Sequence, residues 1–299
     1  MKESNPLAPK WKYAVNTNSL PKDMRYDQVA KLVASLKADG IEWGLPSLAE
    51  APKAAREMAQ ATRDQGLEVA GFINAGNLCK TDEIVRWSEA VAGAGGKSLR
   101  ISPYWVAWDY NESLHQRESF PAMFKKNRQG LEKLIPLGKK FGIRYVLETH
   151  VGNVVPGADL ARRLLDGLDP EVVGIIWDPA NGIGEGHLRP RTAIELLGPY
   201  LAYVHAKNVK WEKDPSDLED NGCKRAKWTL KTCRLDEGIL DWVESYFALN
   251  VTGFSGWVAL EEFFRSDLEP ELRQGLEFLK KCASVAAVAP REPFTTFNE

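Results

Sequence analysis

Four side chains of the metal-ligand type stand at the ends of short apolar runs in this sequence. They are Glu148, Asp178, His205 and Glu261, and the runs cover residues 145–148, 174–178, 203–205 and 257–261. Such runs predict buried β-strands. In a barrel of parallel strands, residues at the C-terminal ends of different strands meet on one face and form the active site. Three carboxylates and one imidazole favour a divalent cation over a thiolate-type zinc site, and we expect Mn²⁺, with Mg²⁺, Co²⁺ or Zn²⁺ as alternatives.

A strand followed by a helix is the repeating unit of the whole chain. The first four strands are expected at 13–15, 41–43, 69–73 and 99–102, ahead of the four runs above. Apolar residues at helical spacing predict helices at 27–37, 53–65, 81–92, 120–141, 158–168, 192–197, 237–249 and 269–286. Gly40 is expected to stop the first helix, and Thr81 is the candidate N-cap of the third. Eight such units predict a single closed (β/α)8 TIM barrel, one α/β domain over residues 1–299.

The competing architecture is an open, doubly wound sheet. Such a sheet binds its ligand at one switch point, usually with a glycine-rich phosphate loop. No G-x-G-x-x-G motif follows the first expected strand. The candidate ligands also lie on strands five to eight, whose ends converge in a closed barrel but not in an open sheet. The sequence therefore favours the barrel.

The composition is that of an ordinary globular protein and excludes several partners. Of 299 residues, 44% are hydrophobic and 27% charged, and the formal net charge of −2 gives no field that would attract nucleic acid or an anionic membrane. Residues 1–12 are polar and lack the apolar core of a secretory signal, and no apolar stretch is long enough to span a bilayer. The cysteines form no C-x-x-C pair, so reduced thiols are expected. We therefore expect a cytoplasmic protein, with a homo-oligomer as a possible assembly.

The segment from about residue 210 to 235 differs from the rest of the chain. It is polar and charged, contains Trp211 and Trp228, and shows no helical period. Long irregular loops in compact domains are usually functional or disordered. Because this segment follows the seventh strand, it should hang over the catalytic face. A solvated excursion fits its composition, as does a lid or a subunit contact, and we favour the last two.

Each candidate ligand has an ordinary alternative when it is taken alone. Glu148 is a charge in an apolar strand, which an ion pair with a neighbouring Lys or Arg would explain. Asp178 precedes a proline and fits turn chemistry. His205 fits a core histidine bonded to backbone. Together the alternatives lose force, because each residue lies at the same end of a successive strand and the sum matches the ligand set of a cation.

The eighth strand leaves two glutamates open. Glu261 and Glu262 are adjacent, so their side chains face opposite sides of the strand. Alternation alone does not choose between them. If Ala259 points into the barrel, while Val258 and Leu260 pack on helices, then Glu261 points inward.

These segments resemble the xylose-isomerase-like barrel superfamily, the sugar phosphate isomerase/epimerase family. The resemblance covers about residues 13–286 and rests on Glu148, Asp178-Pro-Ala-Asn181, His205-Ala-Lys207, Trp257-Val-Ala-Leu-Glu261 and Asp236-Glu-Gly-Ile-Leu-Asp-Trp242. It implies that Glu148, Asp178, His205 and Glu261 bind one divalent metal ion. It thereby also selects Glu261 over Glu262.

The sequence departs from several members of that superfamily. The multi-zinc endonucleases need many more than the four histidines found here, and strands three and four carry none, so DNA repair is not expected. The xylose isomerases proper are longer and have a second metal site, which we do not place in this chain. Ketose 3-epimerases carry a His where this chain has Asn181 and an Arg where it has Trp211. The sugar-binding residues therefore differ from those of a tagatose-type epimerase.

Further polar residues are expected around the mouth of the barrel. Lys207 and His150 each share a strand face with a ligand, so we expect them to be catalytic, together with Glu148 and Glu261. The expected substrate-binding residues follow the strands or point inward from them, and loop polarity or, for Glu42, an ordinary ion pair is their alternative. They are Asn16, Glu42, Asn74, Ser102, Trp105, Asn181 and His187.

The expected reaction is proton transfer next to the carbonyl of a small keto-sugar or related hydroxy-ketone. The metal would stabilise the enediolate as a Lewis acid, one glutamate would take the proton, and the opposing one would return it. His150 or Lys207 would polarise the carbonyl or move a hydroxyl proton. The outcome would be isomerisation or epimerisation. A lyase that expels a β-hydroxyl or glycosyl group from the same enolate is the alternative, and a non-catalytic binding subunit is the second.

Overall fold

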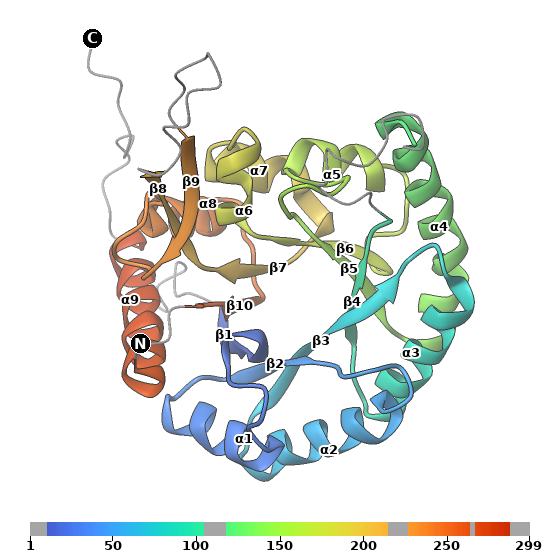
Figure 1. The fold of residues 1–299 in the computed structure, drawn as a ribbon, viewed down its shortest axis with the longest axis horizontal. Helices are drawn as coiled ribbons and strands as arrows, with labels where there is room; N and C mark the ends of the chain where they lie inside the picture. The colour runs from blue at the N-terminus through green and yellow to red at the C-terminus, as the bar shows by residue number, and fades with distance from the viewer. Residues whose placement is uncertain (1–10, 105–117, 215–226, 264–266, 288–299) are drawn as a thin grey trace, which may run out of the picture.

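The computed structural model describes residues 11–104, 118–214, 227–263 and 267–287. Eight parallel strands close into a barrel in the order β1-β10-β7-β6-β5-β4-β3-β2, and helices surround it (Figure 1). The barrel strands are β1 Lys12–Asn16, β2 Gly40–Gly44, β3 Glu68–Asn77, β4 Ser98–Ser102, β5 Arg144–Glu148, β6 Val173–Trp177, β7 Leu201–Ala206 and β10 Trp257–Leu260. The expected (β/α)8 barrel is therefore confirmed.

The helices of the outer ring follow the strands as the apolar spacing predicts. They are α1 Tyr26–Ser35, α2 Ala51–Asp64, α3 Thr81–Gly93, α4 Phe120–Phe141, α5 Ala158–Leu165, α7 Pro190–Leu197, α8 Trp242–Val251 and α9 Leu268–Ala286. The short helix α6, Pro179–Gly182, lies between β6 and α7. No helix in these described ranges is both long enough and apolar enough to cross a membrane.

Some helix boundaries differ from the prediction for local reasons. Helix α1 ends at Ser35, and Gly40 is the first residue of β2 rather than the residue that stops the helix. Thr81 is the first residue of α3 rather than its cap; Lys80 holds the cap position, with no side-chain hydrogen bond. Helix α8 begins at Trp242 instead of residue 237, because the Asp241 side chain accepts hydrogen bonds from the amides of Val243 and Glu244 and so caps the helix there.

The register of β10 decides which glutamate faces inward. Ala259 packs with Ala14 and Ala70 inside the barrel, next to Trp257. Val258 and Leu260 instead belong to the large core between the barrel and its helices. Since side chains alternate along a strand, the residue after Leu260 points inward, as the sequence argument required.

The segment expected as an irregular loop after the seventh strand is in part a two-stranded antiparallel ribbon. Strands β8, Asn208–Asp214, and β9, Lys227–Cys233, pair with Trp211 opposite Leu230. Val209 packs with Ala180 and Leu240, and Leu230 packs against the same cluster, which anchors the ribbon beside α6. The expectation of an irregular loop is therefore wrong for residues 208–214 and 227–233, while residues 215–226 lie outside the described part of the chain. In Figure 1 the ribbon leaves the barrel rim beside α6 and α8.

Candidate metal centre

Glu148, Asp178, His205 and Glu261 come together at the C-terminal ends of β5, β6, β7 and β10. One ligand atom from each lies within 4.8 Å of the others, and all four side chains are buried. The convergence follows from the fold, because these four strands are neighbours in the closed barrel. The group could bind one metal ion. We call these four residues the ligand quartet.

Asp178 is held rigidly by the start of α6. Its Oδ1 accepts hydrogen bonds from the amides of Ala180 (3.0 Å) and Asn181 (3.2 Å), so it caps this helix. Its Oδ2 accepts one from Nδ2 of Asn181 at 2.8 Å and lies 2.7 Å from Nζ of Lys207. Burial raises the pKa of Asp178 to about 6, and Lys207 opposes that rise. Turn chemistry and ligand geometry thus occur in the same residue.

His205 contacts carboxylates through both of its ring nitrogens, two from the quartet and that of Glu42. Its Nδ1 is 3.0 Å from Oε1 of Glu148 and 3.5 Å from Oε2 of Glu261. Its Nε2 is 2.9 Å from Oε2 of Glu42. Burial lowers the pKa of His205, but Glu42, Glu261 and Glu148 together raise it well above its usual value. A proton on Nε2, bound to Glu42, would leave the lone pair of Nδ1 for a metal ion.

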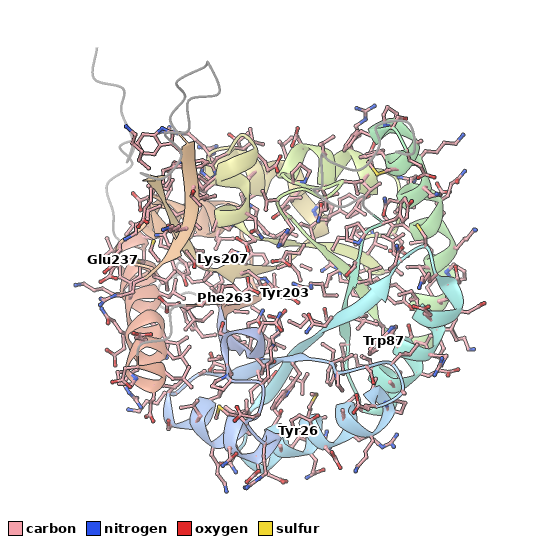
Figure 2. The ribbon with its side chains drawn as sticks, in the orientation of Figure 1. Tyr26, Trp87, Tyr203, Lys207, Glu237 and Phe263 are labelled. Carbon is pink, nitrogen blue, oxygen red and sulfur yellow. The ribbon has the colours of Figure 1, made fainter. Side chains whose placement is uncertain are left out.

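Glu42 contacts His205 through Nε2, the ring nitrogen that does not face Glu148 and Glu261. Its side chain is fully buried and accepts hydrogen bonds from His205 and from the Tyr203 hydroxyl. Figure 2 places Tyr203 and Lys207 near the centre of the barrel, inside the ring of helices. Glu42 therefore points inward, as expected, but its contacts are protein side chains.

Two cations flank the quartet, the buried Lys207 and Arg100, whose side chain is 18% exposed. Nζ of Lys207 lies 2.7 Å from Asp178 and 3.2 Å from Glu261, so these carboxylates raise its pKa although burial lowers it. Arg100 donates a hydrogen bond to Oε2 of Glu148. Burial raises the pKa of Glu148, but Arg100 and His205 outweigh it and hold that pKa well below its usual range.

Arg100 was not singled out in the sequence, although a signal existed. It stands between Leu99 and Ile101 in β4, and both of these neighbours are buried in the outer core. Alternation therefore directs Arg100 into the barrel. A charge inside an apolar strand was the reason for choosing Glu148, and the same reasoning identifies its partner.

The charges of the site fit a divalent cation. Four buried carboxylates, those of Glu42 and the three acidic quartet residues, face the two cations Lys207 and Arg100. Two negative charges then remain uncompensated when His205 is neutral. Buried charge without compensation is costly, and a divalent ion would supply the missing charge.

The structure brings some of the expected mouth residues together beside Glu148. A cavity of about 140 Å³ is lined by Arg100, Ser102, Glu148, His150 and others. His150 is half-buried there, and its Nδ1 lies 2.9 Å from the carbonyl oxygen of Val151. Its Nε2 is thus the ring nitrogen left for a substrate.

Other expected substrate residues contact the carboxylates themselves or lie elsewhere. Asn16 donates to Oε1 of Glu261 at 3.0 Å, and Asn181 bonds to Asp178. Asn74 contacts Arg100. His187 lines a separate cavity of about 20 Å³, and burial lowers its pKa. Trp105 falls outside the residues that the structure describes.

Glu262 faces away from the quartet. A Cβ added to Gly275 of α9 would lie 2.7 Å from Oε2 of Glu262, so this side chain packs between β10 and α9. Burial raises its pKa to about 7. The two adjacent glutamates therefore have separate surroundings.

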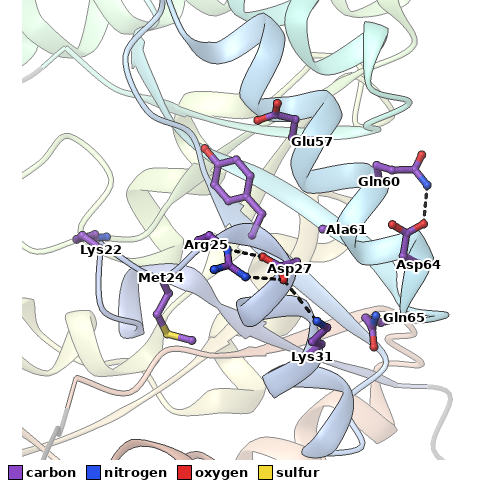
Figure 3. Close-up of a pocket in the computed structure, with 11 residues that line it drawn as sticks. Lys22, Met24, Arg25, Asp27, Lys31, Glu57, Gln60, Ala61, Asp64 and Gln65 are labelled. Carbon is purple, nitrogen blue, oxygen red and sulfur yellow. Dashed lines mark hydrogen bonds and ion pairs between the residues drawn. The ribbon is translucent and has the colours of Figure 1, made fainter.

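A larger cavity, of about 760 Å³, lies at α1 and α2, on the outside of the barrel (Figure 3). Polar side chains that line it bond to one another, for example Arg25 with Asp27 and Gln60 with Asp64. No member of the quartet lines it. Its size alone therefore does not make it the reactive centre.

Comparison with known proteins identifies the family of this chain. The family model described as "Xylose isomerase-like TIM barrel" matches residues 30–282. The inosose dehydratase of Bacillus licheniformis is 23% identical over 154 residues, which cover 50% of this chain and 49% of that protein. The chain thus matches about half the length of this curated relative.

Two solved structures show the same fold. A 3-keto-D-glucoside 4-epimerase from E. coli superposes with a TM-score of 0.70 at 18% identity, covering 91% of this chain and 100% of that one. A xylose isomerase-like TIM barrel protein from Mycobacterium smegmatis, in complex with magnesium, gives a TM-score of 0.67 at 17% identity, covering 94% and 100%.

Proposed function

Because the chain belongs to the xylose isomerase-like TIM barrel family, we propose that it is a divalent-metal-dependent isomerase or epimerase of a small keto-sugar or related hydroxy-ketone. The observation that carries this proposal is the buried ligand quartet at the C-terminal face of the barrel. The carbohydrate epimerase and dehydratase among the similar proteins support it.

The ligand quartet would hold the metal ion, with Mn²⁺ our first choice. When bound, the ion would act as a Lewis acid and stabilise negative charge on the substrate oxygens. Magnesium in one similar protein keeps Mg²⁺ as an alternative.

Glu148 and Glu261 are the candidates for proton transfer. An oxygen of each lies near His205 Nδ1, at 3.0 Å for Glu148 and 3.5 Å for Glu261. Burial raises the pKa of both carboxyl groups, but neighbouring groups lower it further. Arg100 and His205 lower the pKa of Glu148, and Lys207 and His205 lower the pKa of Glu261. Both are thereby kept ionised, so one can remove a proton next to the carbonyl and the other can return it.

Lys207 and His150 have different roles in this proposal. Lys207 is buried between two carboxylates, where it keeps them ionised and in place. His150 faces the cavity beside Glu148 and is the group placed to exchange a proton with a substrate hydroxyl. Glu42 positions His205, while Ser102 lines the cavity as a substrate contact.

A lyase is the second candidate function. The inosose dehydratase similarity favours it, and His150 would then protonate the leaving hydroxyl. A non-catalytic binding subunit is disfavoured, because none of the four ligands is replaced.

One experiment tests the reaction class. Purified protein loaded with Mn²⁺ is incubated with a panel of keto-sugars and hydroxy-ketones in D₂O. Deuterium at the carbon next to the carbonyl, in recovered substrate or in product, supports enolisation, and the product separates isomerase from lyase. Protein that binds Mn²⁺ but exchanges no proton in any substrate of the panel would contradict the proposal.

A further inference from the structure

A continuous series of hydrogen bonds joins Glu148 to Glu261 around the half of the barrel that supplies no quartet residue. It begins at Arg100, which donates to Oε2 of Glu148 and, through Nη2, to Oδ1 of Asn74 at 3.3 Å. Asn74 in turn donates from Nδ2 to Oδ1 of Asn18 at 3.1 Å. These contacts cross from β4 over the end of β3 to the turn after β1.

The series ends at the second glutamate. The backbone amide of Asn18 donates to Oδ1 of Asn16 at 2.7 Å, and Nδ2 of Asn16 donates to Oε1 of Glu261 at 3.0 Å. We call Asn16, Asn18, Asn74 and Arg100 the arc. All its links are direct, without a bridging group.

The arc engages one oxygen of each glutamate and leaves the other towards His205. In Glu148, Oε2 accepts from Arg100 and Oε1 faces Nδ1 of His205 at 3.0 Å. In Glu261, Oε1 accepts from Asn16 and Oε2 faces the same nitrogen at 3.5 Å. The other oxygens are also contacted, Oε1 of Glu148 by Asn181 and Oε2 of Glu261 by Lys207. Rotation of either carboxylate would break its bond to the arc, so the arc contributes to the orientation of both.

Asn74 occupies the middle of the arc in an unusual backbone conformation. Its φ is +69°, and among the described residues only Lys37 is another non-glycine residue with positive φ. The pairing of β3 with β4 shifts register between Phe72 and Ala75, and such bulges redirect side chains at barrel rims. Backbone held in this region is often associated with function.

The end of β2 leaves room for this contact. A Cβ on Gly44 would lie 2.8 Å from Nδ2 of Asn74 and 3.1 Å from Oδ1 of Asn18. An alanine there would push the two asparagine side chains apart. The bulge in β3 and the glycine in β2 therefore both serve one hydrogen bond.

We propose that Asn74 is a positioning residue that, through the arc, orients Glu148 and Glu261 for metal binding and proton transfer. This inference rests on the proposed function. Asn74 touches neither carboxylate and acts through Arg100 on one side and through Asn18 and Asn16 on the other. A residue that only contacted substrate would leave metal affinity unchanged when replaced, so metal affinity without substrate separates the two roles.

The test uses Asn74→Gly in the full chain. Glycine adopts this φ without strain, so the fold is retained while the two side-chain hydrogen bonds are lost. Lys37→Gly is the matched control. Lys37 is also exposed and also has a positive φ, but it lies between α1 and β2. Mn²⁺ affinity of each protein is measured by calorimetry in the absence of substrate.

We expect Asn74→Gly to bind Mn²⁺ about tenfold more weakly, the lower end of the effect of losing outer partners of metal ligands. Lys37→Gly should match the wild type. With an active substrate, Asn74→Gly should lower kcat more than it changes KM. Gly44→Ala should weaken Mn²⁺ binding in the same direction.

The outcomes separate this inference from the proposed function. Wild-type protein that binds no Mn²⁺ would contradict the proposed metal centre itself. If the wild type and Asn74→Gly bind Mn²⁺ with the same affinity, the positioning role is overturned while the metal centre stands. Equal weakening in Asn74→Gly and Lys37→Gly would also overturn it, because the effect would then be one of backbone conformation.

Discussion

Oε2 of Glu42 lies 2.9 Å from Nε2 of His205, at the side of the imidazole opposite the ligand quartet. Glu42 is fully buried and also accepts the hydroxyl of Tyr203, so its orientation is determined by two donors. A carboxylate bound to the outer nitrogen of a ligand histidine orients the ring and selects its tautomer. Glu42 thus orients His205 so that its Nδ1 faces the carboxylates of the quartet.

Glu42→Gln should weaken Mn²⁺ binding by roughly ten- to a hundredfold, since it removes the charge that holds His205. Tyr203→Phe removes only the hydrogen bond to Glu42 and should have a smaller effect. Metal retained after dialysis against metal-free buffer, measured by atomic emission, gives both values. Full retention by Glu42→Gln, or a larger loss in Tyr203→Phe, would refute this role of Glu42.

Glu261→Gln should lower turnover by at least about a hundredfold, the usual effect of a lost acid–base group, while Glu262→Gln keeps most of it. The reason is that Glu261 faces the quartet and Glu262 packs against α9. Rates are compared at saturating metal in variants with matched circular dichroism. Similar losses in both variants would show that the register of β10 is misassigned.

Glu262 should make the wild-type protein less stable as the pH rises. Its folded pKa of about 7 lies above the unfolded value, so the folded state binds the proton more tightly. This contribution is present at low pH and is lost between about pH 4.5 and pH 7, with an upper limit of about 3 kcal/mol.

Glu262→Gln should therefore gain stability relative to the wild type as the pH increases from 5 to 8. Glutamine retains an oxygen that can accept the backbone hydrogen bond from Leu235. Denaturant unfolding at pH 5, 6, 7 and 8 gives the difference in the free energy of unfolding. A difference that does not change with pH would mean that Glu262 titrates at an ordinary value.

His150→Asn should keep its metal and lose roughly a hundredfold or more in rate, because His150 lines the cavity beside Glu148 but is not in the quartet. His187→Asn is the comparison, with a smaller expected loss, since His187 lines another cavity. Metal content and kcat are measured together. Loss of metal from His150→Asn would show that His150 is a metal ligand. Full activity would show that His150 only packs against its neighbours.

The quartet could be predicted from the sequence because each member ends an apolar strand. Strand ends are where a parallel barrel gathers its functional groups, and alternation resolved Glu261 once Ala259 was known to face inward. Glu42 was correctly expected to point inward. Its contacts with His205 and Tyr203 could not be predicted, because they depend on closure of the barrel and on the register shift of β2 against β3 at Ile41 and Glu42.

Other features depended on pairings that a single segment does not reveal. Arg100 lies in the middle of β4, whereas the four quartet residues lie at or near the ends of their strands. In β8, Val209 and Trp211 alternate with Lys210 and Glu212. This alternation is typical of a strand, but the high charge of the segment favoured a loop in the sequence prediction. The arc needs four segments and a bulge in β3, which only the closed barrel brings together.

Glu148, Asp178, His205 and Glu261 should together bind one divalent metal ion. Anomalous diffraction from crystals grown with Mn²⁺ tests it most directly. We predict a single strong peak per chain inside the quartet, with an oxygen or nitrogen of each residue about 2.0–2.3 Å away. A peak elsewhere in the chain, or a quartet without a peak in crystals saturated with Mn²⁺, would contradict the account.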